Sequence, residues 1–161
     1  MRTFAFEYTD MKFFMKLLGW SFLTFFILLF SMVFTVELIG IVAGLILTFG
    51  VPTLIFYLNK KKIRNDGGAT ILDEFCEIKL TAASQNVVFA NIKTYQIEHY
   101  NGAALRIWFR DGTKFKVVAN SNFCDEGQFE IFCRELDGVL QQYRKDTNSD
   151  LTRKASMFDR V

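Results

Sequence analysis

The side chains that most often carry out enzymatic chemistry are few in this sequence. It holds three cysteines, Cys76, Cys124 and Cys133, and a single histidine, His99. An odd number of cysteines with no C-x-x-C spacing argues against a disulfide framework and a zinc site, so we expect buried, reduced thiols. His99 falls near the end of a predicted hairpin, and a lone histidine in such a place favours a structural role.

Acidic residues provide one candidate for a metal site. Asp73, Glu74 and Glu77 cluster on a predicted strand, but a solvated strand face explains them better. The Asp66-Gly67-Gly68 run lacks the lysine and the strand–loop–helix setting of a phosphate-binding loop. No cysteine or serine stands in a nucleophile-elbow context. We therefore expect a protein that is not an enzyme and that uses no metal or cofactor.

Binding chemistry is better represented, by a set of basic residues around a tryptophan. Arginine and tryptophan are enriched where protein partners bind. The net charge of only +2 does not favour a nucleic-acid partner. We predict a contact surface for a protein or peptide, with ordinary solvation of a basic face as the alternative. Its members are Arg106, Trp108, Arg110, Lys114 and Lys116.

The register of two predicted hairpins places this set on one face of a sheet. A two-residue Asn101-Gly102 loop would put Ile97 opposite Arg106, whereas a three-residue loop at 100–102 pairs Ile97 with Leu105. The same loop length at 110–112 pairs Ile107 with Phe115. Both loops then end in glycine, as a type I turn with a G1 bulge requires. The sequence thus predicts a three-stranded antiparallel meander.

An amphipathic helix is expected to cover the other face of this meander. It begins at Asp125, with Gln128 as capping-box partner, and runs to about Tyr143. Two earlier strands are predicted at 71–80 and 87–90. The meander's apolar face comprises Tyr95, Ile97, Leu105, Ile107, Phe109, Phe115 and Val117, and the helix stripe comprises Phe129, Phe132, Cys133, Leu136, Val139, Leu140 and Tyr143.

Two apolar runs precede these elements. Residues 17–36 and 38–58 contain no charged side chain, and only Glu37 separates them. Each run is about 20 residues, enough to cross a hydrocarbon core of roughly 30 Å as a helix. The first run is too long and too rich in Phe for a signal peptide, and no small-residue cleavage site follows it. We predict a transmembrane hairpin with spans at about 13–36 and 38–58 and a tight turn at Glu37.

Basic residues flank this hairpin on one side only. Arg2, Lys12 and Lys16 precede it, and the turn has no basic residue. The positive-inside rule then predicts that both termini are cytosolic, in a multi-pass protein of an inner membrane. The cluster after the second span either only enforces this topology or also binds anionic lipid. It comprises Lys60, Lys61, Lys62 and Arg64.

Small residues suggest how the spans pack. Gly40 and Gly44 form a G-x-x-x-G pattern in the second span, and such spacing allows helix backbones to approach closely. Packing against the chain's own first span is the favoured interpretation. A homodimer, or docking onto a partner's helix, is the alternative.

The predicted fold class is therefore a membrane protein of α+β type. Residues 1–64 form an N-terminal tail, the hairpin and its basic flank, residues 65–145 form a cytosolic domain, and residues 146–161 form a polar C-terminal tail. Asn65 to Gly68 make a short flexible joint at the start of the domain.

The domain resembles the bacterial pleckstrin-homology-like domains carried by small proteins with a pair of transmembrane helices. The resemblance rests on the pattern from Val87 through Ile92 to Ile97, on the segment from Leu105 to Gly112, and on the helix from Asp125. It covers about half the chain, and no invariant motif defines it. The expected strands number about five or six, fewer than in a full domain of this kind. Such domains bind lipids, peptides or other subunits, so the likeness does not assign a function.

Three functions remain open at this point. The first is a membrane-tethered interaction module, acting as a scaffold or regulatory subunit, that presents the domain to a protein or peptide partner. The second is an immunity protein against a membrane-active toxin, and the third is a sensor of anionic lipid.

Overall fold

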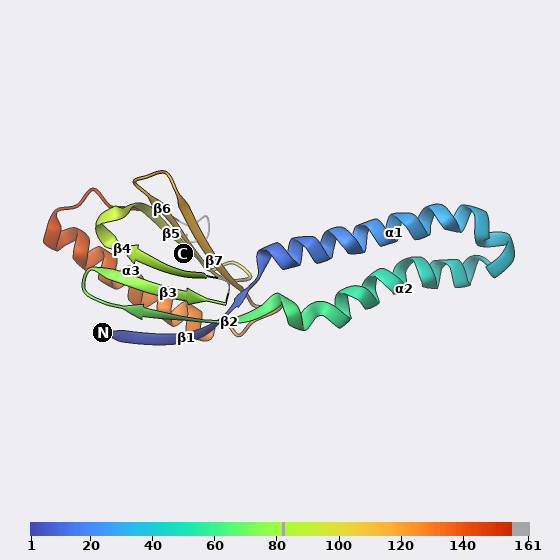
Figure 1. Cartoon of the computed structure of the whole chain (residues 1–161), viewed down its shortest axis with the longest axis horizontal. Helices are drawn as coiled ribbons and strands as arrows, with labels where there is room; N and C mark the ends of the chain where they lie inside the picture. The colour runs from blue at the N-terminus through green and yellow to red at the C-terminus, as the bar shows by residue number, and fades with distance from the viewer. Residues whose placement is uncertain (82, 156–161) are drawn as a thin grey trace. The chain divides into compact units, whose positions relative to one another are not determined.

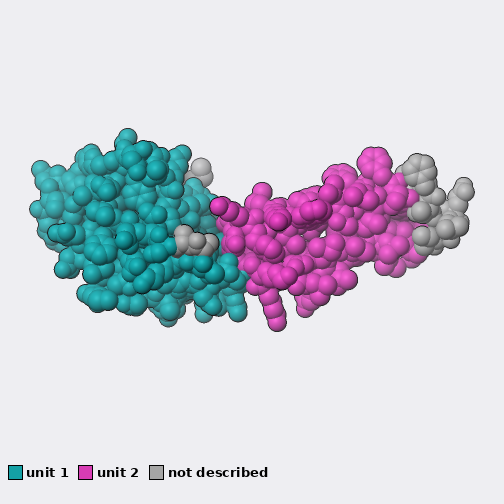
Figure 2. Space-filling model, viewed as in Figure 1, with its two compact units in different colours: residues 1–9, 64–161 teal, residues 10–63 magenta. Residues whose placement is uncertain are grey.

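The structure, a computed structural model, describes residues 1–81 and 83–155, apart from the side chains of residues 33–39 and 83. The chain forms two compact units, shown in different colours in Figure 2: Met1–Thr9 with Arg64–Val161, and Asp10–Ile63. The first contains antiparallel sheets and a helix, and the second contains two long apolar helices (Figure 1). The α+β class predicted from the sequence is confirmed.

The helical unit is a hairpin of α1, Met11–Ile39, and α2, Ile41–Asn59, followed by the short 3-10 helix η1, Lys60–Ile63. Asp10 caps α1, because its Oδ1 accepts a hydrogen bond from the Phe13 amide at 2.9 Å. Both helices are long and apolar enough to cross a membrane.

The turn of this hairpin was predicted at the wrong residue. Glu37 lies inside the last turn of α1, and its side chain is outside the described part of the structure. The break falls at Gly40, whose φ is +81°. Glycine takes this conformation at little cost, whereas a single charged residue does not interrupt a helix.

The segment before the hairpin, predicted as a tail, is a strand of the sheet unit. β1, Arg2–Thr9, pairs antiparallel with β2, Arg64–Ile71, from Arg2 opposite Ile71 to Thr9 opposite Arg64. Residues 65–68, predicted as a flexible joint, therefore lie within β2. Gly67 is needed there, because a Cβ atom would lie 2.9 Å from the Phe6 ring.

The first sheet has the strand order β1-β2-β3-β4. β3 spans Phe75–Leu80, β4 spans Ala83–Val88, and the 3-10 helix η2 spans Phe89–Asn91. The strand predicted at 71–80 is therefore β3 with its start placed too early, because only Ile71 belongs to β2 and a turn follows in which the Leu72 amide donates to the Phe75 carbonyl at 2.9 Å. The strand predicted at 87–90 covers only the end of β4.

The second sheet contains the predicted meander, with its register confirmed. β5 is Ile92–Glu98, β6 is Gly102–Phe109 and β7 is Lys114–Asn120. Ile97 pairs with Leu105, and Ile107 pairs with Phe115.

The two glycine turns differ in detail. Gly102 and Gly112 have φ values of +121° and +85°, as the loop lengths predicted. The turn at Gly112 fits the predicted geometry. At the other turn Asn101 also has a positive φ, 49°, so the type I conformation predicted there is wrong.

Helix α3, Gly127–Thr147, packs its apolar stripe into the core. It begins two residues after Asp125 and ends beyond Tyr143. The predicted capping box is not formed, since the N-cap residue is Glu126 and makes no side-chain capping bond. Asp125 Oδ1 instead accepts a hydrogen bond from the Gly127 amide at 3.1 Å. Among the described side chains of the stripe, Phe129, Phe132, Cys133, Leu136 and Leu140 are fully buried.

The segment predicted as a polar tail contributes to the fold in its described part, residues 146–155. Residues 146–147 complete α3, and Asn148 ends it in a left-handed conformation with φ 49°. The chain then returns to the second sheet as β8, Thr152–Arg153, which pairs parallel with β5. Met157 and Phe158, the apolar residues near the end of the tail, lie outside the described residues.

Candidate interaction surface

The outer face of the second sheet gathers most of the predicted contact residues. Arg106 and Trp108 are half-buried on β6 and alternate with the buried Leu105 and Ile107. On the neighbouring strand β7, Lys116 lies opposite Arg106 and Lys114 lies opposite Trp108. Both lysines are exposed. The face therefore presents one aromatic ring among three basic side chains, on the side of the sheet away from the core.

Ion pairing divides these basic residues into two kinds. Arg106 Nη2 lies 2.8 Å from Glu98 Oε2 on the neighbouring strand. Lys114 and Lys116 form no ion pair within the described part of the chain.

Trp108 is contacted on this face by the chain's own C-terminal segment. Lys154 Nζ lies 4.5 Å from the centroid of the Trp108 ring, in a cation–π arrangement. Lys154 directly follows β8 on the segment predicted to be a tail. The indole is outside the buried core but is partly covered by this segment.

Arg110 contacts the same C-terminal segment. Its guanidinium forms a two-pronged ion pair with Asp150, one arm of which is 3.2 Å long, and Nε donates to the Ala90 carbonyl at 3.0 Å. This contact lowers the pKa of the Asp150 carboxyl below its ordinary value and raises that of Arg110. Arg110 was predicted to contact a partner, and in the structure it holds the chain's own residues.

A groove of about 510 Å³ lies where β5, β8 and the end of α3 meet. At its edge Tyr95 Oη donates to Asp137 Oδ1 at 2.6 Å, and Arg153 Nε lies 3.3 Å from the same oxygen. Burial, and then the bond to Asp137, raise the pKa of Tyr95 well above its ordinary value. From the sequence, Tyr95 was placed only on the apolar face of the meander, and Asp137 and Arg153 were not singled out. The signal that could have found them was Leu151, an apolar residue in a polar segment.

The basic cluster is partly in each unit. Lys60, Lys61 and Lys62 are exposed on η1 at the end of α2. Arg64 is the first residue of β2, and its Nη1 lies 3.4 Å from Glu7 Oε1 on β1.

The two glycines predicted to pack the helices behave differently. Gly44 is buried and faces α1, where a Cβ atom would lie 3.3 Å from the Met32 side chain. Gly40 is the turn residue, and a Cβ atom added there would have no neighbour within 4 Å. Close approach to the chain's own first helix therefore involves Gly44 only.

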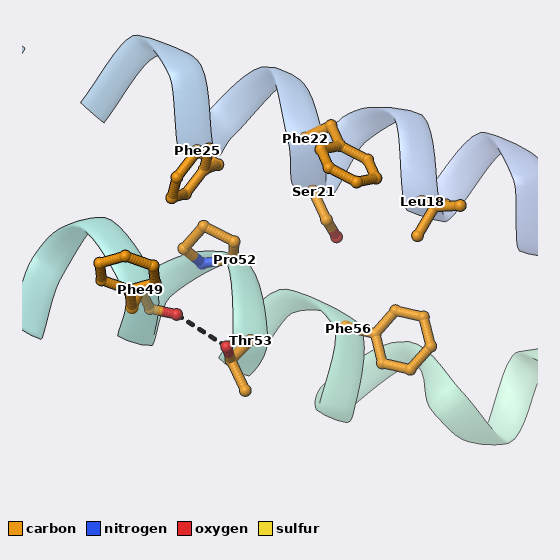
Figure 3. Close-up of a pocket in the computed structure, with 8 residues that line it drawn as sticks. All are labelled: Leu18, Ser21, Phe22, Phe25, Phe49, Pro52, Thr53 and Phe56. Carbon is orange, nitrogen blue, oxygen red and sulfur yellow. Dashed lines mark hydrogen bonds between the residues drawn. The ribbon is translucent and has the colours of Figure 1, made fainter. Parts of the chain in front are cut away.

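Nearer the other end of the hairpin the helices diverge around an apolar groove of about 350 Å³ (Figure 3). Four of its eight lining residues are phenylalanines, and Pro52 interrupts the hydrogen bonds of α2 on this side. Ser21 Oγ projects from α1 into the groove and has no hydrogen-bond partner among the described residues. The lining consists of Leu18, Ser21, Phe22, Phe25, Phe49, Pro52, Thr53 and Phe56.

The residues tested for catalytic chemistry do not gather at any of these places. Burial raises the pKa of the Cys76 thiol to about 12 and also raises that of Cys133. His99 Nδ1 lies 3.7 Å from Glu130 Oε1 at the surface. Asp73 and Glu74 are in the turn between β2 and β3, whereas Glu77 is on β3 beside Lys79. Within residues 1–81 and 83–155, no three His, Cys, Asp or Glu side chains form a metal-binding group.

Comparisons with family models and with curated proteins identify no relative of this chain. No protein-family model matches the sequence, and a search of curated proteins finds no match either.

Proposed function

We propose that this chain is a membrane-tethered interaction module, which presents its sheet domain to a protein or peptide partner at the cytosolic face of a bacterial inner membrane. The observation that carries the proposal is the outer face of the second sheet. There Trp108 lies among Arg106, Lys114 and Lys116, outside the core. Aromatic and basic side chains on such a face are typical of surfaces that bind other proteins.

The pairing of β1 with β2 supports the hairpin topology. β1 precedes α1, and β2 directly follows η1. The two strands pair along their whole length. Strands of one sheet must lie on the same side of a membrane, so the segment between them crosses an even number of times. Two apolar helices meet this requirement. The basic residues that flank the hairpin then favour a cytosolic domain.

The strand order supports the resemblance to pleckstrin-homology-like domains. β1 to β4 form one antiparallel sheet and β5 to β7 form the meander of the second, after which α3 packs on the core. The strands lacking from the sequence-based count are β1, β2 and β8. On this proposal the transmembrane hairpin is inserted within the domain, after its first strand.

Sensing of anionic lipid is the second candidate. It is favoured by the exposure of Lys60, Lys61 and Lys62 directly after α2. Each such lysine contributes about 1 kcal/mol near an anionic leaflet. In this function the basic cluster and the domain together contact lipid headgroups, whereas in the first candidate Trp108 and Lys116 contact a protein.

Site-specific photo-cross-linking in membranes tests the proposal. A photoreactive phenylalanine analogue replaces Lys116, and in a matched variant it replaces Lys79, an exposed lysine on β3 of the other sheet. The proposal predicts a discrete protein adduct from position 116 and none from position 79. Equal adducts from both positions, or lipid adducts only, would contradict it.

A further inference from the structure

The last strand of the sheet unit is held by few contacts. β8 pairs with β5 over two residues, Thr94 opposite Thr152 and Tyr95 opposite Arg153. One backbone bond follows, from the Lys154 amide to the Tyr95 carbonyl at 2.8 Å, and Gln96 Nε2 donates to the Ala155 carbonyl at 3.2 Å. A short strand added to a sheet edge in this way reproduces how many domains bind extended peptides.

A single side chain of this segment is buried, and ion pairs of Asp150 with Arg110 and of Arg153 with Asp137 hold it at the surface. Leu151 is 1% exposed, while every other residue from 150 to 155 is exposed. Leu151 enters the groove beside Tyr95 and Leu140. Segments with so few buried contacts belong to the parts of a protein that open locally without global unfolding. Because α3 already ends at Asn148, release of the segment would leave the helix intact.

Asp137 gives the site a requirement for positive charge. Its side chain is 19% exposed and faces the guanidinium of Arg153. If the segment leaves, a half-buried carboxylate loses its cation. A replacement segment must therefore supply a basic side chain two positions after its apolar anchor, as Arg153 follows Leu151.

We propose that the edge of β5 is the docking site for an extended segment of a partner protein, in which an apolar residue is followed two positions later by Arg or Lys. Residues 150–155 occupy this site in cis and act as a displaceable competitor. Displacement also moves Lys154 from the ring of Trp108, so binding at the edge uncovers the outer face of the sheet. This inference rests on the proposed function as an interaction module and names its site.

A peptide-binding assay on the full chain in mild detergent tests the inference. The probe is a fluorescent peptide with the sequence Asp-Leu-Thr-Arg-Lys-Ala of residues 150–155. Leu151→Asp, which releases the cis segment, should bind it at least tenfold more tightly than wild type. Thr152→Ala, which changes an exposed side chain of the same segment, should match wild type. A peptide with Asp in place of its Leu should not bind.

Equal affinity for wild type and Leu151→Asp, with both proteins folded, would overturn the inference. A wild-type dimer that becomes monomeric on Leu151→Asp would identify the occupant as a second copy of the chain, and would also overturn it. A failed peptide assay with an intact cross-link from position 116 removes this inference and leaves the proposed function standing. If the peptide binds as expected but that cross-link is lost, the proposed contact at position 116 is contradicted and the docking site on β5 is supported.

Hydrogen exchange on the wild-type chain provides a second test, needed if Leu151→Asp does not fold. The Lys154 amide should exchange at least a hundredfold faster than the slowest amides of β6, because it is freed by local opening. Equal rates for the two would make β8 a permanent strand and overturn the inference.

Discussion

The two units bury the same residue types in opposite ways. In the sheet unit Phe129 and Phe132 are 0% exposed, whereas in the hairpin Phe30 is 71% exposed and Trp20 58%. Water drives burial of apolar surface in the first case. The second arrangement is the one expected of helices that lie in the apolar interior of a bilayer. Among the described phenylalanines, the buried ones all belong to the sheet unit and the exposed ones all belong to the hairpin.

The largest expected effect tests this difference directly. Phe132→Ala should lower the free energy of unfolding of the sheet unit by about 3–5 kcal/mol, since it removes a fully buried ring. Phe30→Ala, the matched change in the hairpin, should alter it by less than about 0.5 kcal/mol. Urea unfolding of the full chain in detergent measures both. Similar losses from the two variants would mean that the units are not separately stabilised.

The next largest loss of stability is expected at the two glycine turns. At Gly102 an added Cβ would lie 2.0 Å from the Ala119 carbonyl oxygen, whereas at Gly112 it would meet open space. Gly112→Ala should therefore cost about 1–2 kcal/mol, the strain of a positive φ alone. Gly102→Ala should cost more, because the backbone must also move. Unfolding midpoints decide the order, and an equal or reversed order would contradict the geometry of these turns.

Alkaline pH should weaken the sheet unit. The pKa of Cys76 rises from 9.0 in its ordinary state to about 12 on folding, so the folded chain retains a proton that the unfolded chain releases. The contribution of this thiol to the free energy of unfolding is therefore fully present below about pH 9 and is lost as the pH rises towards 12. Tyr95 and Cys133 shift in the same direction. Urea midpoints should decrease between pH 8.5 and 10.5, and less steeply in Cys76→Ala. A urea midpoint that is constant over this pH range would contradict the raised pKa of Cys76 in the folded chain.

Only a small effect on stability is expected at Trp108. Its ring is on the outer face and contacts Lys154, an interaction worth about 0.5–1 kcal/mol. Trp108→Ala should leave the melting temperature within a few degrees of wild type and reduce the cross-link from position 116. Unfolding of this variant would show that Trp108 belongs to the core, and would remove the surface from the account.

Local patterns in the sequence were sufficient for the meander and for the stripe of α3. Both depend on alternation or helical spacing between residues close together in the chain, such as Ile97 with Leu105 across one turn. The positions of Arg106, Trp108, Lys114 and Lys116 on one face follow from that register. These were therefore predictable without a structure.

The strands at the two ends of the chain were missed for a different reason. Phe4, Phe6 and Tyr8 alternate as a strand requires, but their partner β2 lies beyond the whole hairpin, and Gly67 and Gly68 in β2 are typical of a loop. β8 contains two residues, and only Leu151 marks it. Pairing over such distances depends on the tertiary fold, and no local periodicity reports it.

In the proposed function α1 and α2 form a transmembrane hairpin, and the sheet unit is in the cytosol. Reporter fusions after Val161 in intact bacteria test it most directly. A green fluorescent protein fusion should be fluorescent and an alkaline phosphatase fusion inactive, because the first reporter matures in the cytosol and the second only outside it. An active phosphatase with a dark fluorescent fusion would place the C-terminus outside the cytosol and contradict the account.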